Sequence, residues 1–110
     1  MNALRNKVQL IGHVGQEPEI KILEGGKKLA KLTLATNEVY YNDKKEKVTD
    51  TQWHNITAWG KTAEIIESFV TKGKEIALEG KLTYRTWEDS NGEKRYFTEI
   101  VANELLLLGK

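Results

Sequence analysis

The segment from Trp53 to Gly60 holds the residues best suited to binding chemistry, because it places two tryptophans in one strand-like stretch. Successive side chains of a β-strand point to opposite faces. One face, here called the Trp face, therefore carries Trp53, Asn55, Thr57 and Trp59, and the other carries His54, Ile56 and Ala58. Flat aromatic rings on an open sheet are surfaces on which nucleobases stack. Two interpretations remain open: the Trp face meets solvent or a ligand, or it forms the core and tolerates Asn55 and Thr57.

A second stretch repeats this combination of rings and polar groups. Alternation from Lys81 to Trp87 puts Lys81, Thr83, Arg85 and Trp87 on one face and Leu82 and Tyr84 on the other. Cations neutralise the phosphates of a nucleic acid while rings stack on its bases, and neither contact requires a particular base sequence. The alternative is a solvated face with one interfacial aromatic, and recurrence on two strands weighs against it.

Composition limits the classes of protein to which the chain could belong. Its 110 residues fit one domain, spanning 1–110. With 17 Lys and Arg against 16 Asp and Glu, the net charge is +1, so any nucleic-acid site must be a local patch. There is no cysteine, and His13 and His54 are the only histidines. Since no P-loop, metal-ligand set or nucleophile with a base is recognisable, we expect neither an enzyme nor a bound metal or cofactor.

The chain shows no segment that would direct it into a membrane. Its first residues lack an apolar signal region, and no run approaches the length of a membrane span. We therefore expect a soluble, cytoplasmic protein.

Apolar alternation and turn residues predict an all-β domain with one short helix. The expected strands lie near Lys7–Val14, Lys28–Thr36, Thr51–Gly60, Glu75–Trp87 and Arg95–Leu108. The helix is expected from about Lys61 to Lys72, with an apolar stripe of Ala63, Ile66, Phe69 and Val70 and with Gly73 as its left-handed stop. Five strands with a helix between the third and fourth are the arrangement of the OB-fold, a partly open Greek-key barrel.

Turn chemistry predicts how the strands are joined. Glu24–Lys27 is expected to form a hairpin turn, and Ser90–Glu93 an Asn-Gly type I′ turn between the last two strands. Because those two strands exceed what a small barrel needs, their hairpin should project as a flap. The charged segment Tyr40–Thr49 is expected to be a mobile loop.

Four sequence blocks, in this order and spacing, carry a resemblance to a known family. They are Asn6–Glu19 (NKVQLIGHVGQEPE), Leu32–Thr36 (LTLAT), Thr51–Lys61 (TQWHNITAWGK) and Lys72–Trp87 (KGKEIALEGKLTYRTW), the last continuing through Gly92 to Arg95 and Tyr96. The chain resembles the bacterial single-stranded DNA-binding proteins over essentially its whole length.

This resemblance implies roles for individual residues. Trp53 and Trp87 match base-stacking tryptophans of the family, and Trp59 stands where the family usually has a stacking phenylalanine. Tyr40 falls where many members carry a further tryptophan. The positions matching basic residues that line the family's DNA path are Lys7, Lys61, Lys72 and Arg85. His54 matches a histidine associated with subunit contacts, and Asn55 occupies a position that is often arginine.

The expected function is sequence-independent binding and protection of single-stranded DNA during replication, recombination and repair. The resemblance also implies a homotetramer around which the DNA wraps. Family members usually continue into a flexible linker with an acidic tip that recruits replication and repair enzymes, whereas this sequence stops at Lys110. We therefore expect these 110 residues not to recruit such enzymes. The alternatives are an OB-fold protein-interaction scaffold of a primosome, with the aromatics buried against another protein, and an oligosaccharide binder.

Overall fold

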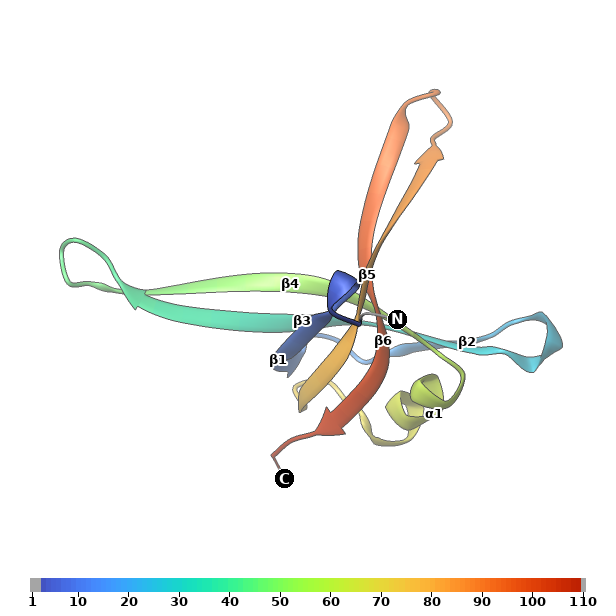
Figure 1. Cartoon of the computed structure of the whole chain (residues 1–110), viewed down its shortest axis with the longest axis horizontal. Helices are drawn as coiled ribbons and strands as arrows, with labels where there is room; N and C mark the ends of the chain where they lie inside the picture. The colour runs from blue at the N-terminus through green and yellow to red at the C-terminus, as the bar shows by residue number, and fades with distance from the viewer. Residues whose placement is uncertain (1–2, 110) are drawn as a thin grey trace.

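Two long β-hairpins and one short helix dominate the architecture (Figure 1). The computed structural model describes residues 3–109. The elements in chain order are the 3₁₀ turn η1 (Ala3–Asn6), β1 (Val8–Val14), β2 (Glu19–Ile22), the 3₁₀ turn η2 (Glu24–Gly26), β3 (Lys28–Tyr41), β4 (Lys47–Trp59), α1 (Gly60–Phe69), β5 (Glu75–Glu88) and β6 (Lys94–Leu107).

The strands close into a barrel because β1 pairs on both of its sides. It runs antiparallel to β5 over Val8–His13, and at His13 and Val14 it also pairs with β3. The complete order is β1-β5-β6-β4-β3-β2, and the β4–β6 contact is parallel over three residue pairs. Since β1 and β2 both pair antiparallel with β3, they are two parts of one interrupted strand. The result is a closed five-stranded barrel with a helix after its third strand, which confirms the predicted OB-fold.

The continuation of the first strand, β2, is absent from the strands predicted from sequence. The chain leaves the ladder after Gly15, whose N–H donates to the Thr33 carbonyl at 2.9 Å, and re-enters it at Glu19. The intervening stretch contains Pro18, which has no N–H to offer a ladder. Because β2 has four residues, three of them exposed, its alternation is too short to be distinguished from a turn.

Burial decides which face of the Trp53–Gly60 segment is internal. Ile56 and Ala58 are 2% and 0% exposed, whereas Trp53 and Trp59 are 63% and 43% exposed. The buried core comprises Val14, Ala30, Leu32, Leu34, Ile56, Ala58, Ala63, Ile66, Val70, Ile76, Leu78, Ile100 and Ala102. The Trp face is therefore the outside of the barrel, and the interpretation that made it the core is wrong.

The helix α1 covers one end of the barrel but is shorter than predicted. Ala63, Ile66 and Val70 are buried as expected, whereas Phe69 is 62% exposed and does not belong to the apolar stripe. The helix ends because Val70 adopts an extended conformation. Gly73 does have a positive φ of 86°, but it lies in the following turn, where its N–H donates to the Val14 carbonyl at 2.8 Å. Within residues 3–109, no helix has the length and apolar character needed to cross a membrane.

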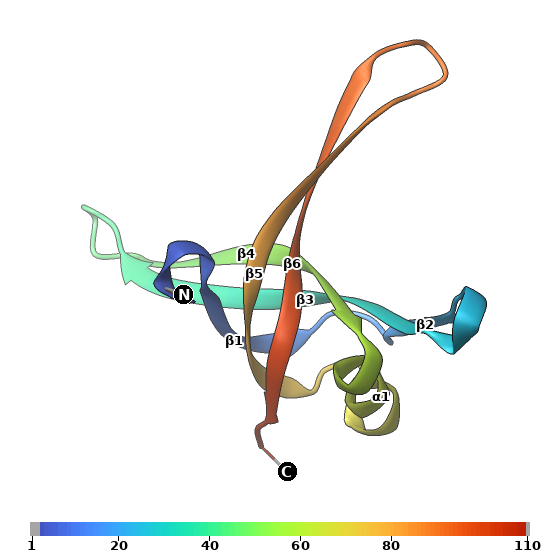
Figure 2. The ribbon, with the colours of Figure 1, turned by 45° about the vertical axis from the view of Figure 1, so that its right-hand side comes forward.

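Both long hairpins project from the barrel (Figure 2). The hairpin β5–β6 is paired out to Glu88 and Lys94, which confirms the predicted flap. The hairpin β3–β4 is paired out to Tyr41 and Lys47, so half of the expected mobile loop Tyr40–Thr49 is strand and only residues 42–46 form the turn. The segment is rich in charged residues, so it shows too little apolar alternation for its strand ends to be predicted from sequence.

The turn at the tip of β5–β6 is not type I′. That turn type requires a positive φ at both central residues, whereas Lys45 is the only non-glycine residue between 3 and 109 with a positive φ, so Asn91 does not have one. Gly92 alone is left-handed, with a φ of 79°, and its N–H donates to the Asp89 carbonyl at 3.0 Å. The Asp89 carboxylate then accepts from the N–H groups of Asn91 and Glu93, at 2.9 and 3.0 Å.

The pKa of the Asp89 carboxyl should lie below its ordinary value because hydrogen bonds in this turn stabilise its charged form. The Arg95 side chain, 2.8 Å away, lowers the pKa most, and the Glu93 and Asn91 N–H groups lower it further. Because its pKa is depressed in the folded state, the carboxylate stabilises the tip at any pH above the ordinary pKa. This stabilisation is lost as the pH falls through the folded pKa. Carboxyl-carbon NMR should give an Asp89 midpoint below 3.8. A midpoint at or above this value would show that the Arg95 pair is not formed in solution.

Candidate nucleic-acid interface

The outer face of β3 and β4 presents the Trp face with its neighbours in register. Trp53 lies opposite Ala35, Asn55 opposite Thr33, Thr57 opposite Lys31 and Trp59 opposite Leu29. Trp59 follows Trp53 by six positions, which at about 3.3 Å per residue places their backbones about 20 Å apart. Two exposed rings at this separation can each stack on a different base of one extended nucleic-acid strand.

Trp53 is positioned by a glycine that sequence reasoning did not assign to the site. A Cβ at Gly15 would lie 2.4 Å from Cζ3 of Trp53 and 2.7 Å from Oγ1 of Thr33. Any larger residue would therefore displace the indole. The Trp53 ring lies over the backbone where β1 is interrupted, which holds it in place while most of it stays exposed.

The hairpin β5–β6 provides a second face of rings and cations. Trp87 pairs with Arg95 and Arg85 pairs with Phe97, so these four side chains share one face. Trp87 is 50% exposed. The guanidinium carbon of Arg85 lies 5.5 Å from the centre of the Phe97 ring, within the range of a cation–π contact.

The two faces meet at Lys31. A cavity of about 410 Å³ lies between β3 and the β5–β6 hairpin and is lined by Lys31, Arg85, Thr86, Trp87 and Phe97. Two cations and two aromatic rings thus converge on one opening. Neither Lys31 nor Phe97 was among the predicted site residues. The signal for Lys31 was present, because alternation in the expected strand Lys28–Thr36 puts Lys31 on the outer face. Phe97 could not be placed in this way, because the expected two-residue Asn-Gly turn would set Thr98, and not Phe97, opposite Arg85.

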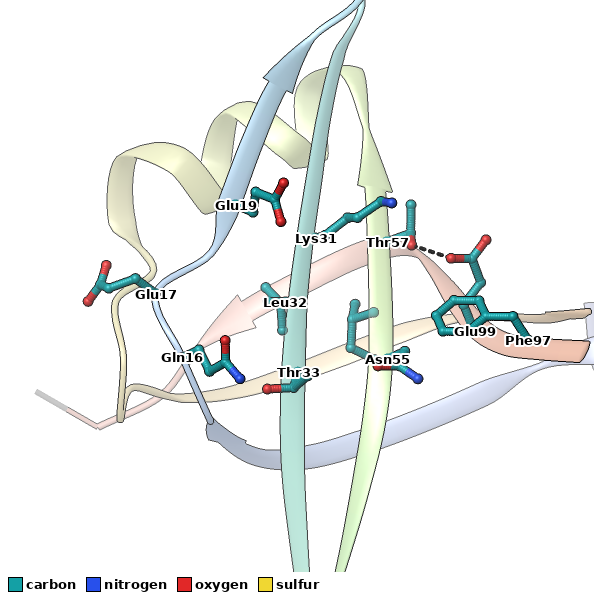
Figure 3. A pocket seen from close by; sticks show the side chains of 11 residues that line it. Gln16, Glu17, Glu19, Lys31, Leu32, Thr33, Asn55, Thr57, Phe97 and Glu99 are labelled. Carbon is teal, nitrogen blue, oxygen red and sulfur yellow. Dashed lines mark hydrogen bonds between the residues drawn. The ribbon is translucent and has the colours of Figure 1, made fainter. Parts of the chain in front are cut away.

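A second cavity, of about 200 Å³, adjoins the first and shares Lys31 and Phe97 with it (Figure 3). Its polar lining includes Gln16, Glu17, Glu19, Thr33, Asn55, Thr57 and Glu99. Thr57 is 4% exposed although it belongs to the Trp face, and its hydroxyl donates to Oε2 of Glu99 at 2.7 Å. Sequence reasoning missed this buried pair because Glu99 is remote from Thr57 along the chain.

The predicted cations do not all reach these cavities. Arg85 lines one of them, whereas Lys61 lies in the first turn of α1 and Lys72 in the turn beyond it, both exposed. The backbone N–H of Lys72 donates to Glu17 at 2.9 Å, which fixes that turn beside the smaller cavity. The Lys7 ammonium lies 3.0 Å from Glu79. This ion pair holds the pKa of the Glu79 carboxyl below its ordinary value, chiefly through the hydrogen bond from Lys7.

Tyr40 and His54 lie away from the Trp face. In the β3–β4 ladder Tyr40 pairs with Val48, and Leu34 pairs with His54. Tyr40 and Leu34 are an even number of positions apart on β3, so both lie on the face opposite Trp53. Its neighbour Tyr41, 70% exposed, is the tyrosine that shares the Trp face. His54 is half-buried, and its Nε2 lies 2.9 Å from Oγ1 of Thr36, within hydrogen-bond distance.

An OB barrel that carries exposed tryptophans beside cations has the architecture of a nucleic-acid-binding domain. The chain belongs to the single-strand binding protein family, whose profile matches residues 5–108. This confirms the resemblance found in the sequence. It also agrees with the expectation that the chain is a binding protein and not an enzyme.

Individual relatives support this assignment. The chain is 41% identical over 105 residues to single-stranded DNA-binding protein 1 of Chlorobaculum tepidum, covering 94% of this chain and 65% of the relative. It is 41% identical over 106 residues to single-stranded DNA-binding protein 1 of Xylella fastidiosa, covering 96% and 78%. The chain thus spans just under two thirds of the length of the first relative.

Solved structures show the same fold. A complex of the Plasmodium falciparum single-stranded DNA-binding protein with single-stranded DNA has a TM-score of 0.87 and 36% identity, covering 94% of this chain and 95% of that one. A deletion mutant of the Thermus aquaticus single-stranded DNA-binding protein has a TM-score of 0.82 and 29% identity, covering 94% and 50%.

Proposed function

We propose that this chain binds and protects single-stranded DNA without sequence preference and performs no chemistry on it. The observation that carries the proposal is the outward placement of Trp53 and Trp59, while Ile56 and Ala58 of the same strand fill the core. Rings that a fold leaves exposed beside cations are available for stacking. The family and the DNA-bound relative give independent support.

The proposed contacts combine stacking with charge neutralisation. Bases stack on Trp53, Trp59 and Trp87, and Tyr40 joins them if the strand passes round the β3–β4 hairpin to its other face. The cations proposed to meet phosphates are Lys7, Lys31, Lys61, Lys72 and Arg85. Such a protein would coat single strands during replication, recombination and repair in the cytoplasm.

Tryptophan fluorescence tests this function directly. Oligo-dT should quench the emission strongly, because stacked bases contact the indole rings, whereas duplex DNA and oligosaccharides should not. An RNA oligomer measures the preference between the two nucleic acids. Absence of quenching by any nucleic acid would contradict the proposal and favour the protein-interaction scaffold.

Salt should weaken the binding despite the net charge of only +1. The logarithm of the association constant should fall against the logarithm of salt concentration by about 0.7 per neutralised phosphate. Lys61→Ala or Lys72→Ala should each reduce this slope by about 0.7 without changing the preference among DNA sequences. Lys27→Ala, at the tip of the β2–β3 hairpin, is the control and should leave the slope unchanged. Affinity that is independent of salt would rule out the phosphate contacts.

We also propose that the chain forms a homotetramer. The outer face of β1, β5 and β6 carries an exposed apolar row in which Ile11 pairs with Ala77 and Ala77 with Leu106. Ile11 and Leu106 are each 62% exposed and line a groove of about 760 Å³. The edge of β1 is unpaired beside them from Val8 to Gly12, and a second copy would cover both features.

Light scattering should report the mass of a tetramer at micromolar concentration. Ile11→Asp should lower that mass with the fold intact, because it places a charge in the apolar row. Val39→Asp is the matched control, since Val39 is similarly exposed, at 53%, but lies on the β3–β4 hairpin. A wild-type chain that remains monomeric would contradict the assembly and leave the DNA-binding proposal to be judged separately.

A further inference from the structure

A buried carboxylate lies in the middle of the surface proposed to meet phosphates. The Glu99 side chain is only 8% exposed. Its Oε2 accepts both from Thr57 Oγ1, at 2.7 Å, and from Arg85 Nη2, at 3.0 Å. Figure 3 shows Glu99 among the side chains that line the smaller cavity, with its bond to Thr57 drawn.

This carboxylate could act on DNA binding in two opposite ways. It could hold the Arg85 guanidinium in the orientation that a phosphate requires, in which case its loss would weaken binding. Alternatively it could cancel the charge of Arg85, in which case its loss would strengthen binding. The geometry of the pair decides between these effects.

The geometry favours cancellation of charge. The ion pair uses one Arg85 nitrogen, whereas a carboxylate that orients an arginine firmly does so through two parallel bonds. The guanidinium is held independently by the Phe97 ring. Because Glu99 is largely shielded from solvent, its repulsion of a phosphate next to Arg85 is screened less by salt than that of an exposed carboxylate. Glu17 and Glu19 line the same cavity beside Lys31. Glu19 is paired with Lys21 at 3.4 Å, so among residues 3–109 Glu17 and Glu99 are the carboxylates of this cavity without such a lysine partner.

We propose that Glu99 is a built-in limit on affinity for single-stranded DNA, because it neutralises Arg85 at the point where a phosphate would bind. The proposal rests on the DNA-binding function proposed above. It assigns to Glu99 the regulation of that site. The DNA strand is bound less tightly than the exposed rings and cations alone would bind it, and it dissociates faster.

Glu99→Gln tests the proposal, since glutamine keeps the shape and an acceptor oxygen for Thr57 but removes the charge. We expect tighter binding of oligo-dT at low salt. One more effective phosphate contact steepens the salt slope by about 0.7, so the advantage over wild type should shrink about fivefold for each tenfold rise in salt. Fluorescence titrations at several salt concentrations measure both quantities.

Two further variants separate the alternatives. Glu24→Gln makes the same change in net charge at the distant tip of the β2–β3 hairpin and should leave affinity and slope unchanged. Glu99→Asp keeps the charge but alters the geometry, and it should bind no more weakly than wild type. Thermal melts establish that each variant is folded at the assay temperature. If Glu99→Gln does not fold, Glu99→Asp alone still distinguishes the two roles, because an orienting role of Glu99 predicts that Glu99→Asp binds DNA more weakly than wild type.

The outcomes distinguish this proposal from the function on which it rests. If wild type binds oligo-dT and Glu99→Gln binds equally or more weakly, the limit on affinity is overturned and the function stands. If wild type does not bind single-stranded DNA, both are overturned.

Discussion

Replacing Ile56 by alanine should lower the free energy of unfolding by about 2–5 kcal/mol. Ile56 is 2% exposed and lies between Leu32 on β3 and Ile100 on β6, its direct partners in the ladder. Removal of its side chain opens a cavity at the parallel contact where β4 meets β6, and close-packed neighbours collapse only partly into such a space. Urea denaturation followed by circular dichroism measures the loss.

Ile22 provides a matched control for this substitution. It is also an isoleucine in a strand, but it is 70% exposed. Ile22→Ala should therefore change the unfolding free energy by at most about 0.5 kcal/mol. If Trp59→Ala unfolded the domain while Ile56→Ala left it intact, the assignment of inner and outer faces would be wrong.

Trp53→Ala should weaken binding of oligo-dT by about 1–3 kcal/mol, or about five- to 150-fold, with the fold intact. The ring is 63% exposed and contributes surface for stacking more than it contributes to the core. Fluorescence anisotropy of a labelled oligo-dT measures the dissociation constant without relying on the remaining tryptophans. Circular dichroism melts of the same samples measure folding.

Trp53→Phe is the conservative counterpart. It keeps a flat ring over Gly15 and should recover much of the affinity lost in Trp53→Ala. An alanine variant that binds like wild type would remove Trp53 from the DNA path. If the phenylalanine variant binds as weakly as the alanine variant, a contact specific to the indole, and not stacking alone, would account for the role of Trp53.

The residues that share a face of a strand could be predicted from sequence because side-chain alternation is a local property, whereas which face is internal was decided by burial in the structure. Once Ile56 and Ala58 are placed inside, Trp53 and Trp59 must be outside, and the structure bears this out. Apolar spacing also located the helix and the barrel strands. Both patterns depend only on residues close together in the chain.

Features that depend on distant residues or on exact backbone geometry were missed. Glu99 is buried because Thr57 and Arg85, from two other strands, supply its partners, and no local pattern contains that information. The helix end was misplaced because Val70 packs into the core in an extended conformation before Gly73 is reached. Tyr40 was assigned by resemblance and its stacking role stays a prediction, while the ladder register, which sequence reasoning did not provide, places Tyr41 on the Trp face.

The interrupted first strand has a consequence for the order in which this fold forms and opens. The hairpins β3–β4 and β5–β6 join residues that are close in sequence, whereas β1 closes the barrel by pairing with β5, far along the chain. Contacts between distant residues require a large loss of chain entropy and tend to form late. The two hairpins that bear Trp53 and Trp87 should therefore assemble before the barrel closes. In the native state, β1 should detach first, and amide protons on β1 should exchange sooner than those in the middle of β4. The β1 edge is thus the part of the barrel that should open first, and because Gly15 at its end lies under the Trp53 ring, this opening should loosen Trp53 but not Trp87.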